Sequence, residues 1–424
     1  MKFPKNLLKA SSLSIVFKTG ATLNLILFNR IIKNVIDPIY LNEVVFYIYL
    51  SPIIILLSNF GLKTLIAKNQ LPQNSHKSNF SDIYFFIISF FSTLFYSVGY
   101  YLIFLKDFFE VIFILKFFCA SLFISFYHLI ISMLMGKKFF LPANFFGGFQ
   151  LNGFFFGMLL NIILFWLYSQ SIIIDLEYFF NLILLISLTC LLVIIISNFK
   201  NINFKNYSRK FSDLLPKSFF LFSKNIFEQS GSLDIIFIRF LFDENLVYIY
   251  ATMASFGRLI LTPLNIFSPV LIPFVNENLA KKGKKNFMFL RNISAISFLL
   301  SFILFIIIVS FFSKILSFYS INSQFELAFS IIFLISLGSL IRVFKGNPET
   351  VLILAEKEKE VFLISLFSML IYFLSLGILS PLIGLIGILL SRIIYILFQA
   401  FLSLYYLKMT LNLTTIPSFK SNEI

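Results

Sequence analysis

The chain has 424 residues, of which 59% are hydrophobic, only 12% are charged and 61 are Phe. This composition is far from that of a soluble globular domain and excludes soluble folds of this length. The formal net charge is +15, and its placement along the chain assigns it to membrane orientation and attraction to anionic headgroups, so no nucleic-acid partner is needed to explain it.

Apolar stretches long enough to cross a bilayer follow one another along the chain. A spanning helix needs about 20 mostly apolar residues, because every backbone N–H and C=O must be satisfied inside the segment. The predicted spans are Leu13–Ile32, Val44–Ala67, Ile83–Leu105, Val111–Met135, Asn144–Tyr168, Leu176–Ile196, Ser218–Phe240, Leu246–Phe274, Ile293–Phe312, Leu327–Val343, Val361–Leu379 and Leu382–Leu407. The last two are separated only near Ser380 and Pro381. We therefore predict an all-α polytopic membrane protein with about twelve transmembrane helices.

Positive charge is concentrated in alternate loops. If the N-terminus is cytoplasmic, the outer loops hold only Arg30, Lys33, Lys106, Arg239 and Lys314, whereas the inner loops hold many more Lys and Arg side chains, including the run from Lys281 to Lys285. Short loops rich in Lys and Arg stay on the cytoplasmic side. Both termini are therefore predicted to be cytoplasmic.

The chain offers little that is typical of an enzyme. Cys119 and Cys190 both lie inside apolar helices, which gives neither a disulfide framework nor a Cys-based metal site. No Gly-rich phosphate loop, HExxH or GxSxG motif is present, and no cofactor is expected. The longest loop, roughly Ser197–Lys217, is too short to fold as a domain. These observations favour a transporter over a membrane glycosyltransferase or polysaccharide polymerase.

A repeated pattern divides the chain into halves. Leu23-Asn24-Leu25, Arg30 and Tyr47-Ile48-Tyr49 recur in order as Leu233-Asp234-Ile235, Arg239 and Tyr248-Ile249-Tyr250. Both copies begin in the cytoplasm, which predicts parallel repeats around a central cavity. The alternative is chance similarity between Phe- and Ile-rich helices. The predicted organisation is an N-terminal lobe at 1–200, a cytoplasmic linker at 201–217 and a C-terminal lobe at 218–424, with six helices in each lobe.

Charged side chains in the interior of the spans indicate what such a cavity would bind. The positive ones are Lys18, Lys116, Lys224, Arg258 and Arg392, and the negative ones are Glu228 and Asp234. Each central charge costs about 2.5–3.5 kcal/mol on insertion scales, so these residues are expected to face protein or water. Lys116 lies near the outer boundary and can snorkel, and Lys224 and Glu228 are spaced to form a local ion pair.

The excess of positive charge favours an anionic cargo. Arg forks two hydrogen bonds onto phosphate oxygens, so Arg258 and Arg392, near mid-helix, are the leading candidates for substrate contacts, assisted by Lys18 and Lys224. Four tyrosines near the outer ends of helices are candidates either for stacking on sugars or for an interfacial aromatic belt. These are Tyr47, Tyr49, Tyr248 and Tyr250.

The chain resembles the polysaccharide-repeat flippases of the O-antigen (Wzx) type, in the multidrug/oligosaccharidyl-lipid/polysaccharide exporter superfamily. The likeness covers nearly the whole chain and rests on loose motifs. They are Asn59-Phe60-Gly61-Leu62, the stretch from Leu233-Asp234 through Tyr248-Ile249-Tyr250, Pro273 followed by the run Lys281 to Lys285, Pro348-Glu349-Thr350 to Lys359, and Gly384-Leu385-Ile386-Gly387. The chain departs from many members in its Phe and Ile content.

The resemblance implies a two-lobed, multi-pass protein of the bacterial inner membrane. Its cargo would be an undecaprenyl-diphosphate-linked oligosaccharide, carried from the cytoplasmic to the outer leaflet as the lobes rock. A polysaccharide polymerase and a chain-length regulator are the expected protein partners. Asp234 and Glu228 are the candidates for coupling to H⁺ or Na⁺, with a structural ion pair as the alternative for each. A drug or cation exporter of the same superfamily, a membrane polymerase or glycosyltransferase, and a structural scaffold remain the competing functions.

Overall fold

The structure is a computed structural model of the 424-residue chain. It describes residues 5–59, 80–81, 83–100, 111–136, 139–147, 153–202, 206–207, 219–226, 230–242, 245–267, 275, 288–319, 321 and 324–417. All statements below concern these residues.

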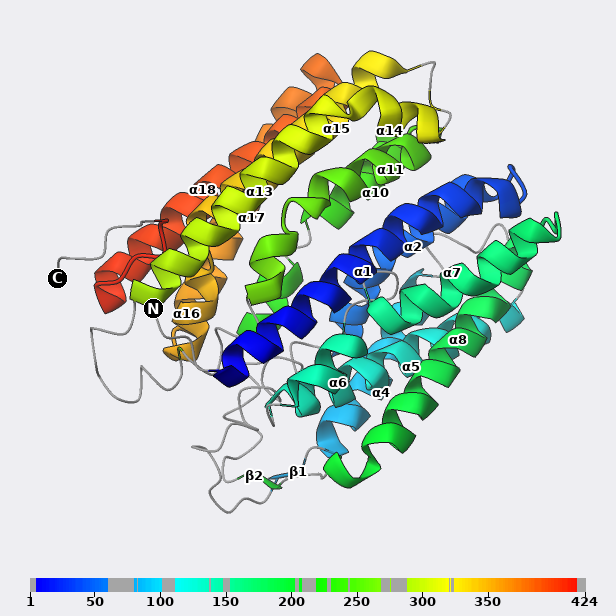
Figure 1. The fold of residues 1–424 in the computed structure, drawn as a ribbon, viewed down its shortest axis with the longest axis horizontal. Helices are drawn as coiled ribbons and strands as arrows, with labels where there is room; N and C mark the ends of the chain where they lie inside the picture. The colour runs from blue at the N-terminus through cyan, green and yellow to red at the C-terminus, as the bar shows by residue number, and fades with distance from the viewer. Residues whose placement is uncertain are drawn as a thin grey trace. The chain divides into compact units, whose positions relative to one another are not determined.

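The described chain is almost entirely helical (Figure 1). In its first half the helices are α1 (Lys5–Val35), α2 (Leu41–Asn59), α4 (Ile83–Tyr100), α5 (Val111–Gly136), α6 (Phe140–Phe145), α7 (Phe154–Ser169), α8 (Leu176–Asn198) and η4 (Phe199–Asn201). In the second half they are α10 (Ser230–Leu241), α11 (Asn245–Leu259), α13 (Met288–Ser310), α14 (Phe312–Tyr319), α15 (Phe325–Lys345), α16 (Pro348–Leu354), α17 (Glu358–Ile383) and α18 (Leu385–Leu411). Two short strands, β1 (Phe80–Ser81) and β2 (Asn206–Tyr207), pair antiparallel.

Each of the twelve predicted spans coincides with described helix over most of its length. Seven described helices are long and apolar enough to cross a membrane: Ser14–Val35, Leu115–Met135, Leu176–Asn198, Leu290–Ser310, Phe325–Lys345, Glu358–Ile383 and Leu385–Leu411. Shorter apolar helices cover Leu41–Leu50, Phe85–Gly99 and Phe154–Ser169. The chain is therefore an all-α polytopic membrane protein, as predicted.

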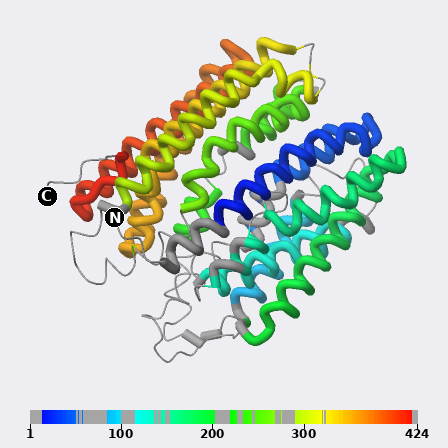
Figure 2. Tube along the Cα trace, in the orientation of Figure 1, coloured from blue at the N-terminus to red at the C-terminus, as the bar shows by residue number. Residues whose placement is uncertain are grey.

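The chain forms two compact units. The residue colours of Figure 2 allow the helices of each unit to be followed. Unit 1 comprises Met1–Thr19 and Leu233–Ile424, and unit 2 comprises Gly20–Ser232. The divisions fall inside α1 and inside α10. Most of the predicted linker at 201–217 lies outside the described residues, so the predicted lobe boundaries stay a prediction.

Unit 2 is built around α5, which packs against α2, α4 and α8. Tyr47 of α2 fills its centre, with ring centroids 5.6 Å from Phe117 of α5 and 4.6 Å from Phe180 of α8. Aromatic edges directed at neighbouring rings fix the rotation of each helix about its axis. The predicted span 144–168 is interrupted, since α6 ends at Phe145 and α7 begins at Phe154.

Unit 1 is centred on α15, which contacts α11, α13 and α18, while α18 packs along α17. α17 passes through Pro381 to Ile383, so the break predicted near Ser380 and Pro381 lies instead at Gly384. Gly384 adopts a φ of +62°, a conformation that glycine reaches without strain. One residue therefore suffices to reverse the chain into α18.

Candidate functional site

The candidate site is a buried polar network in unit 1 that joins four helices. Asp234 comes from α10, Tyr250 from α11, Tyr372 from α17 and Arg392 from α18. The Asp234 Oδ1 atom accepts a hydrogen bond from the Tyr372 hydroxyl at 2.7 Å. Its Oδ2 atom accepts from the Tyr250 hydroxyl at 2.9 Å and from Arg392 Nη1 at 3.0 Å. Arg392 Nη1 also donates to the Tyr250 hydroxyl oxygen at 3.2 Å.

Burial makes these contacts energetically important. Asp234, Tyr250 and Tyr372 are 0% exposed, and Arg392 is 6% exposed. An isolated buried charge loses several kcal/mol of hydration, which a partner of opposite sign with good hydrogen-bond geometry largely offsets. The Asp234 carboxylate and the Arg392 guanidinium supply each other with that partner. The network as a whole is therefore neutral.

Aromatic packing holds the network in place. The Tyr372 ring lies 6.2 Å from that of Tyr395 and 6.4 Å from that of Phe237. Phe237 follows Asp234 by one helical turn, and Tyr395 follows Arg392 by the same interval, so each helix presents its charged side chain and an aromatic ring on one face. The rings limit the freedom of the Tyr372 hydroxyl and keep it directed at the carboxylate.

Two of the predicted site residues, Asp234 and Arg392, are thus brought together. Arg392, predicted as a substrate contact, forms an ion pair with Asp234, which is the structural alternative given for that acid. A second predicted interior cation, Lys116, is also paired, with Glu177 in the first turn of α8. The excess of positive charge inside the spans is smaller than the sequence suggested.

The remaining predicted residues are more dispersed. Arg258, in the last turn of α11, is partly buried and close enough to Tyr250 for electrostatic interaction. Lys18, in the part of α1 that belongs to unit 1, is partly buried. Lys224 belongs to unit 2, where its Nζ donates to Asn225 Oδ1 at 3.4 Å. Glu228 lies outside the described residues, so its predicted pairing with Lys224 stays a prediction.

The four tyrosines of the repeat are buried, between 0% and 6% exposed. Neither an interfacial belt nor a sugar-stacking surface fits side chains covered in this way, and both interpretations are wrong for this structure. Tyr250 instead donates to Asp234, and Tyr49 accepts a hydrogen bond from Asn29 Nδ2 at 3.1 Å. The hydroxyls of Tyr250 and Tyr49 therefore form hydrogen bonds with polar side chains of their own units.

The predicted repeat aligns Asp234 with Asn24, which has different surroundings in unit 2. Asn24 Nδ2 donates to the Phe154 carbonyl at 2.9 Å, and the Asn24 carbonyl accepts from Asn161 Nδ2 at 2.8 Å. Asn24 is 8% exposed. At the corresponding position of the repeat, unit 2 therefore carries a neutral amide where unit 1 carries a carboxylate.

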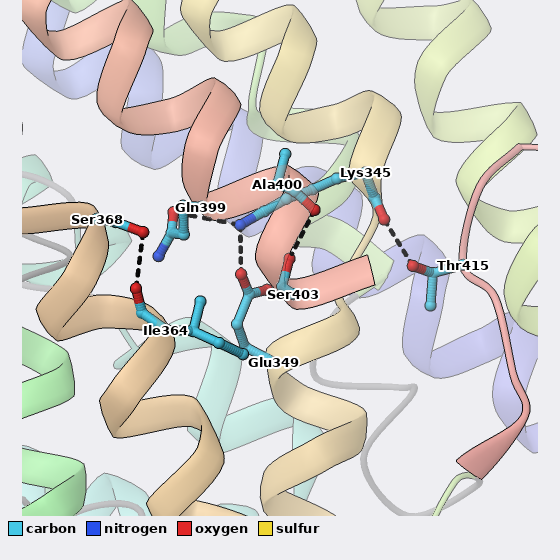
Figure 3. Close-up of polar contacts among 8 residues, drawn as sticks. All are labelled: Lys345, Glu349, Ile364, Ser368, Gln399, Ala400, Ser403 and Thr415. Atoms are coloured by element: carbon cyan, nitrogen blue, oxygen red, sulfur yellow. Dashed lines mark hydrogen bonds and ion pairs between the residues drawn. The ribbon is translucent and has the colours of Figure 1, made fainter. Parts of the chain in front are cut away.

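A second buried polar cluster joins α15, α16 and α18 and was not predicted (Figure 3). Lys345, the last residue of α15, forms an ion pair with Glu349 of α16, and each residue is 7% exposed. Lys345 Nζ also donates to Gln399 Oε1 of α18 at 3.3 Å. The Thr415 hydroxyl, near the C-terminus, donates to the Lys345 carbonyl at 2.6 Å. The signal in the sequence that could have indicated the pair is the four-residue spacing of Lys345 and Glu349.

Comparison with known proteins identifies the fold. No protein-family model matches the chain, and neither does any curated protein. A mutant of the Vibrio cholerae MATE transporter VcmN superposes with a TM-score of 0.67 and 13% identity, over 96% of this chain and 97% of that one. An outward-facing multidrug resistance MATE family transporter of the MOP superfamily gives 0.67 and 13%, over 96% and 95%.

A MOP superfamily transporter from Pyrococcus furiosus is also similar, with a TM-score of 0.58 and 12% identity over 95% of this chain and 94% of that one. The reverse polarity of its binding pocket suggests a different function for that protein. Matches that cover both chains almost completely show that this chain has the fold of the MATE transporters. Identities of 12–13% show the fold alone.

Proposed function

We propose that the chain is a transporter, not an enzyme, and that it flips an undecaprenyl-diphosphate-linked oligosaccharide from the cytoplasmic to the outer leaflet of a bacterial inner membrane. The fold shared with MATE transporters supports transport. The flippase motifs of the sequence support this particular cargo.

The observation that supports an anionic cargo is that basic side chains outnumber acidic ones in the interior of the described spans. Asp234 is the only acid in the interior of the described spans, and Arg392 already neutralises it. Arg258, Lys18 and Lys224 add positive charge in partly buried positions. Cations in a medium of low dielectric constant favour a diphosphate over an organic cation. We propose Arg258 and Lys18, which both belong to unit 1, as contacts of the diphosphate, with Arg258 foremost. The role of Lys224, in unit 2, in substrate binding stays a prediction.

Export of an organic cation is the competing function, because a multidrug transporter shares the fold. Purified protein in vesicles separates the two. The flippase hypothesis predicts that a fluorescent undecaprenyl-diphosphate oligosaccharide becomes accessible in the opposite leaflet at a rate that requires the protein, while ethidium movement stays at the level of empty vesicles. Protein-dependent ethidium movement without lipid flipping would establish the competing function.

Arg258 provides the corresponding mutational test. Arg258→Ala is expected to reduce flipping at least tenfold, and Arg258→Lys to recover part of it, since an ammonium keeps the charge and loses the bidentate geometry. Lys408→Ala is the control, because Lys408 is an exposed cation in the last turn of α18. Equal flipping by Arg258→Ala and Lys408→Ala protein would remove Arg258 from substrate binding.

A further inference from the structure

The Asp234 carboxylate accepts three hydrogen bonds from within the chain, of the about four that its two oxygens can accept. Oδ1 accepts from Tyr372, and Oδ2 accepts from both Tyr250 and Arg392. The donors come from three helices other than α10 and none is a loop residue. The carboxylate is 0% exposed. An entering cation would have to reach a fully buried carboxylate that already holds a guanidinium.

The chemistry of the donor set opposes such an exchange. A guanidinium stays protonated throughout the physiological pH range, so Arg392 cannot leave by losing its charge. A proton added to Asp234 would leave that guanidinium buried without a counter-ion, and Na⁺ would place two cations on one carboxylate. In either state, the attraction between Asp234 and Arg392 no longer compensates the cost of removing the buried charges from water. The ionisable groups around Asp234 are Arg392, Tyr250 and Tyr372, and Arg258 adds further positive charge near Tyr250.

Unit 2 supports this interpretation independently. Its repeat-related residue, Asn24, is neutral and bonded to backbone and side-chain groups of unit 2. One half of the repeat is therefore neutral at this position through an amide, and the other through an ion pair. Neither arrangement provides an unoccupied carboxylate.

We propose that Arg392 is a built-in counter-ion for Asp234, and that the pair positions α10, α11, α17 and α18 without binding H⁺ or Na⁺ during transport. Asp234 and Arg392 are then positioning residues. Neither contacts the cargo. The proposal concerns the conformational framework of unit 1, and it rests on the proposed function only where the experiment measures transport.

A double-mutant cycle on the full chain tests the pair without any substrate. Asp234→Asn and Arg392→Met should each lower the thermal unfolding midpoint by roughly 10 °C, because each leaves one buried charge alone. The double variant should return to within about 3 °C of wild type, since it buries no charge. The partly exposed Lys357–Glu360 pair is the matched control, and Lys357→Met with Glu360→Gln should change little. Additive losses at Asp234 and Arg392 would overturn the proposal whatever the cargo is.

Transport by the same proteins gives the second readout. Wild-type flipping should be equal in Na⁺ and K⁺ buffers and at external pH values on either side of neutrality. The double variant should keep at least half of the wild-type rate with the same indifference to ions. A stable double variant that no longer transports would overturn the proposal. A wild-type Na⁺ or pH dependence that disappears on Asp234→Asn would establish ion coupling at Asp234. If no lipid flipping occurs, ethidium movement takes its place, so failure of the flippase hypothesis leaves the test of the pair intact.

Discussion

Gly387 shows how closely two helices approach in unit 1. A Cβ atom at this position would lie 2.2 Å from the Leu379 carbonyl oxygen and 2.8 Å from the Ser380 backbone nitrogen. Those atoms belong to the backbone of α17, which cannot swing aside as the end of a side chain can. Gly377, in α17 itself, would place a Cβ with no atom within 4 Å. A side chain therefore fits at position 377 and does not fit at position 387.

Alanine at each position gives a matched comparison. Gly387→Ala should lower the free energy of unfolding by about 1–3 kcal/mol, and the thermal midpoint by roughly 2–10 °C, through overpacking. Gly377→Ala should leave the midpoint unchanged or raise it, since alanine favours a helix over glycine by up to about 1 kcal/mol. Equal midpoints for the two variants in detergent-solubilised protein would show that α17 and α18 do not approach this closely.

At the same scale, the sequence revealed which residues carry charge inside the spans and could not reveal how they pair. Asp234 and Arg392 are 158 positions apart, beyond the reach of any helical spacing rule. No basic residue lies three or four positions from Asp234, so helical spacing indicates no partner for its carboxylate. The two side chains meet only in the folded unit 1, where Arg392 of α18 donates to Asp234 of α10.

At the scale of elements, the segment that follows α18 contacts the turn between α15 and α16. Thr415 is 2% exposed and donates to the Lys345 carbonyl. Gly346 turns the corner with a φ of +72°, and a Cβ there would lie 3.1 Å from the Thr415 Cβ atom. The segment after α18 is therefore a structural part of unit 1.

Replacing the Thr415 hydroxyl tests this attachment. Thr415→Val should destabilise the protein by about 1–3 kcal/mol, because the buried Lys345 carbonyl loses its donor. Thr414→Val is the control, since Thr414 is partly exposed and its hydroxyl only accepts a bond from Ile416 N at 3.3 Å. Thermal unfolding that does not distinguish the two variants would show that the segment contributes nothing to stability.

Helices were predicted best where apolar runs are long and uninterrupted. The predicted spans 111–135 and 176–196 agree with α5 and α8 to within a few residues. The prediction was poorer at 144–168, because hydropathy does not distinguish one long helix from the shorter α6 and α7. It also missed α16, a seven-residue helix whose burial depends on its contacts with α17 and α18.

At the scale of the whole molecule, orientation follows from charge. Reporter fusions at Asp175 and Glu326 should report the outer side, and fusions at Lys205 and Lys284 the cytoplasm. Asp175 caps the N-terminus of α8 and Glu326 lies in the first turn of α15, so both mark described helix ends. Lys205 and Lys284 lie outside the described residues. A cytoplasmic signal at Asp175 together with an outer signal at Lys284 would invert the predicted topology.

The single-residue turn at Gly384 has a consequence for biosynthesis. Residues 361–391 carry no charged side chain, and Leu382 and Ile383 at the tip are 73% and 46% exposed. Without charged side chains, the tip is not stabilised in water during synthesis of α18. α17 and α18 are therefore expected to leave the translocation machinery together, as one hairpin. The side from which the hairpin enters is then decided at its open end, by Lys357, Lys359 and Lys408.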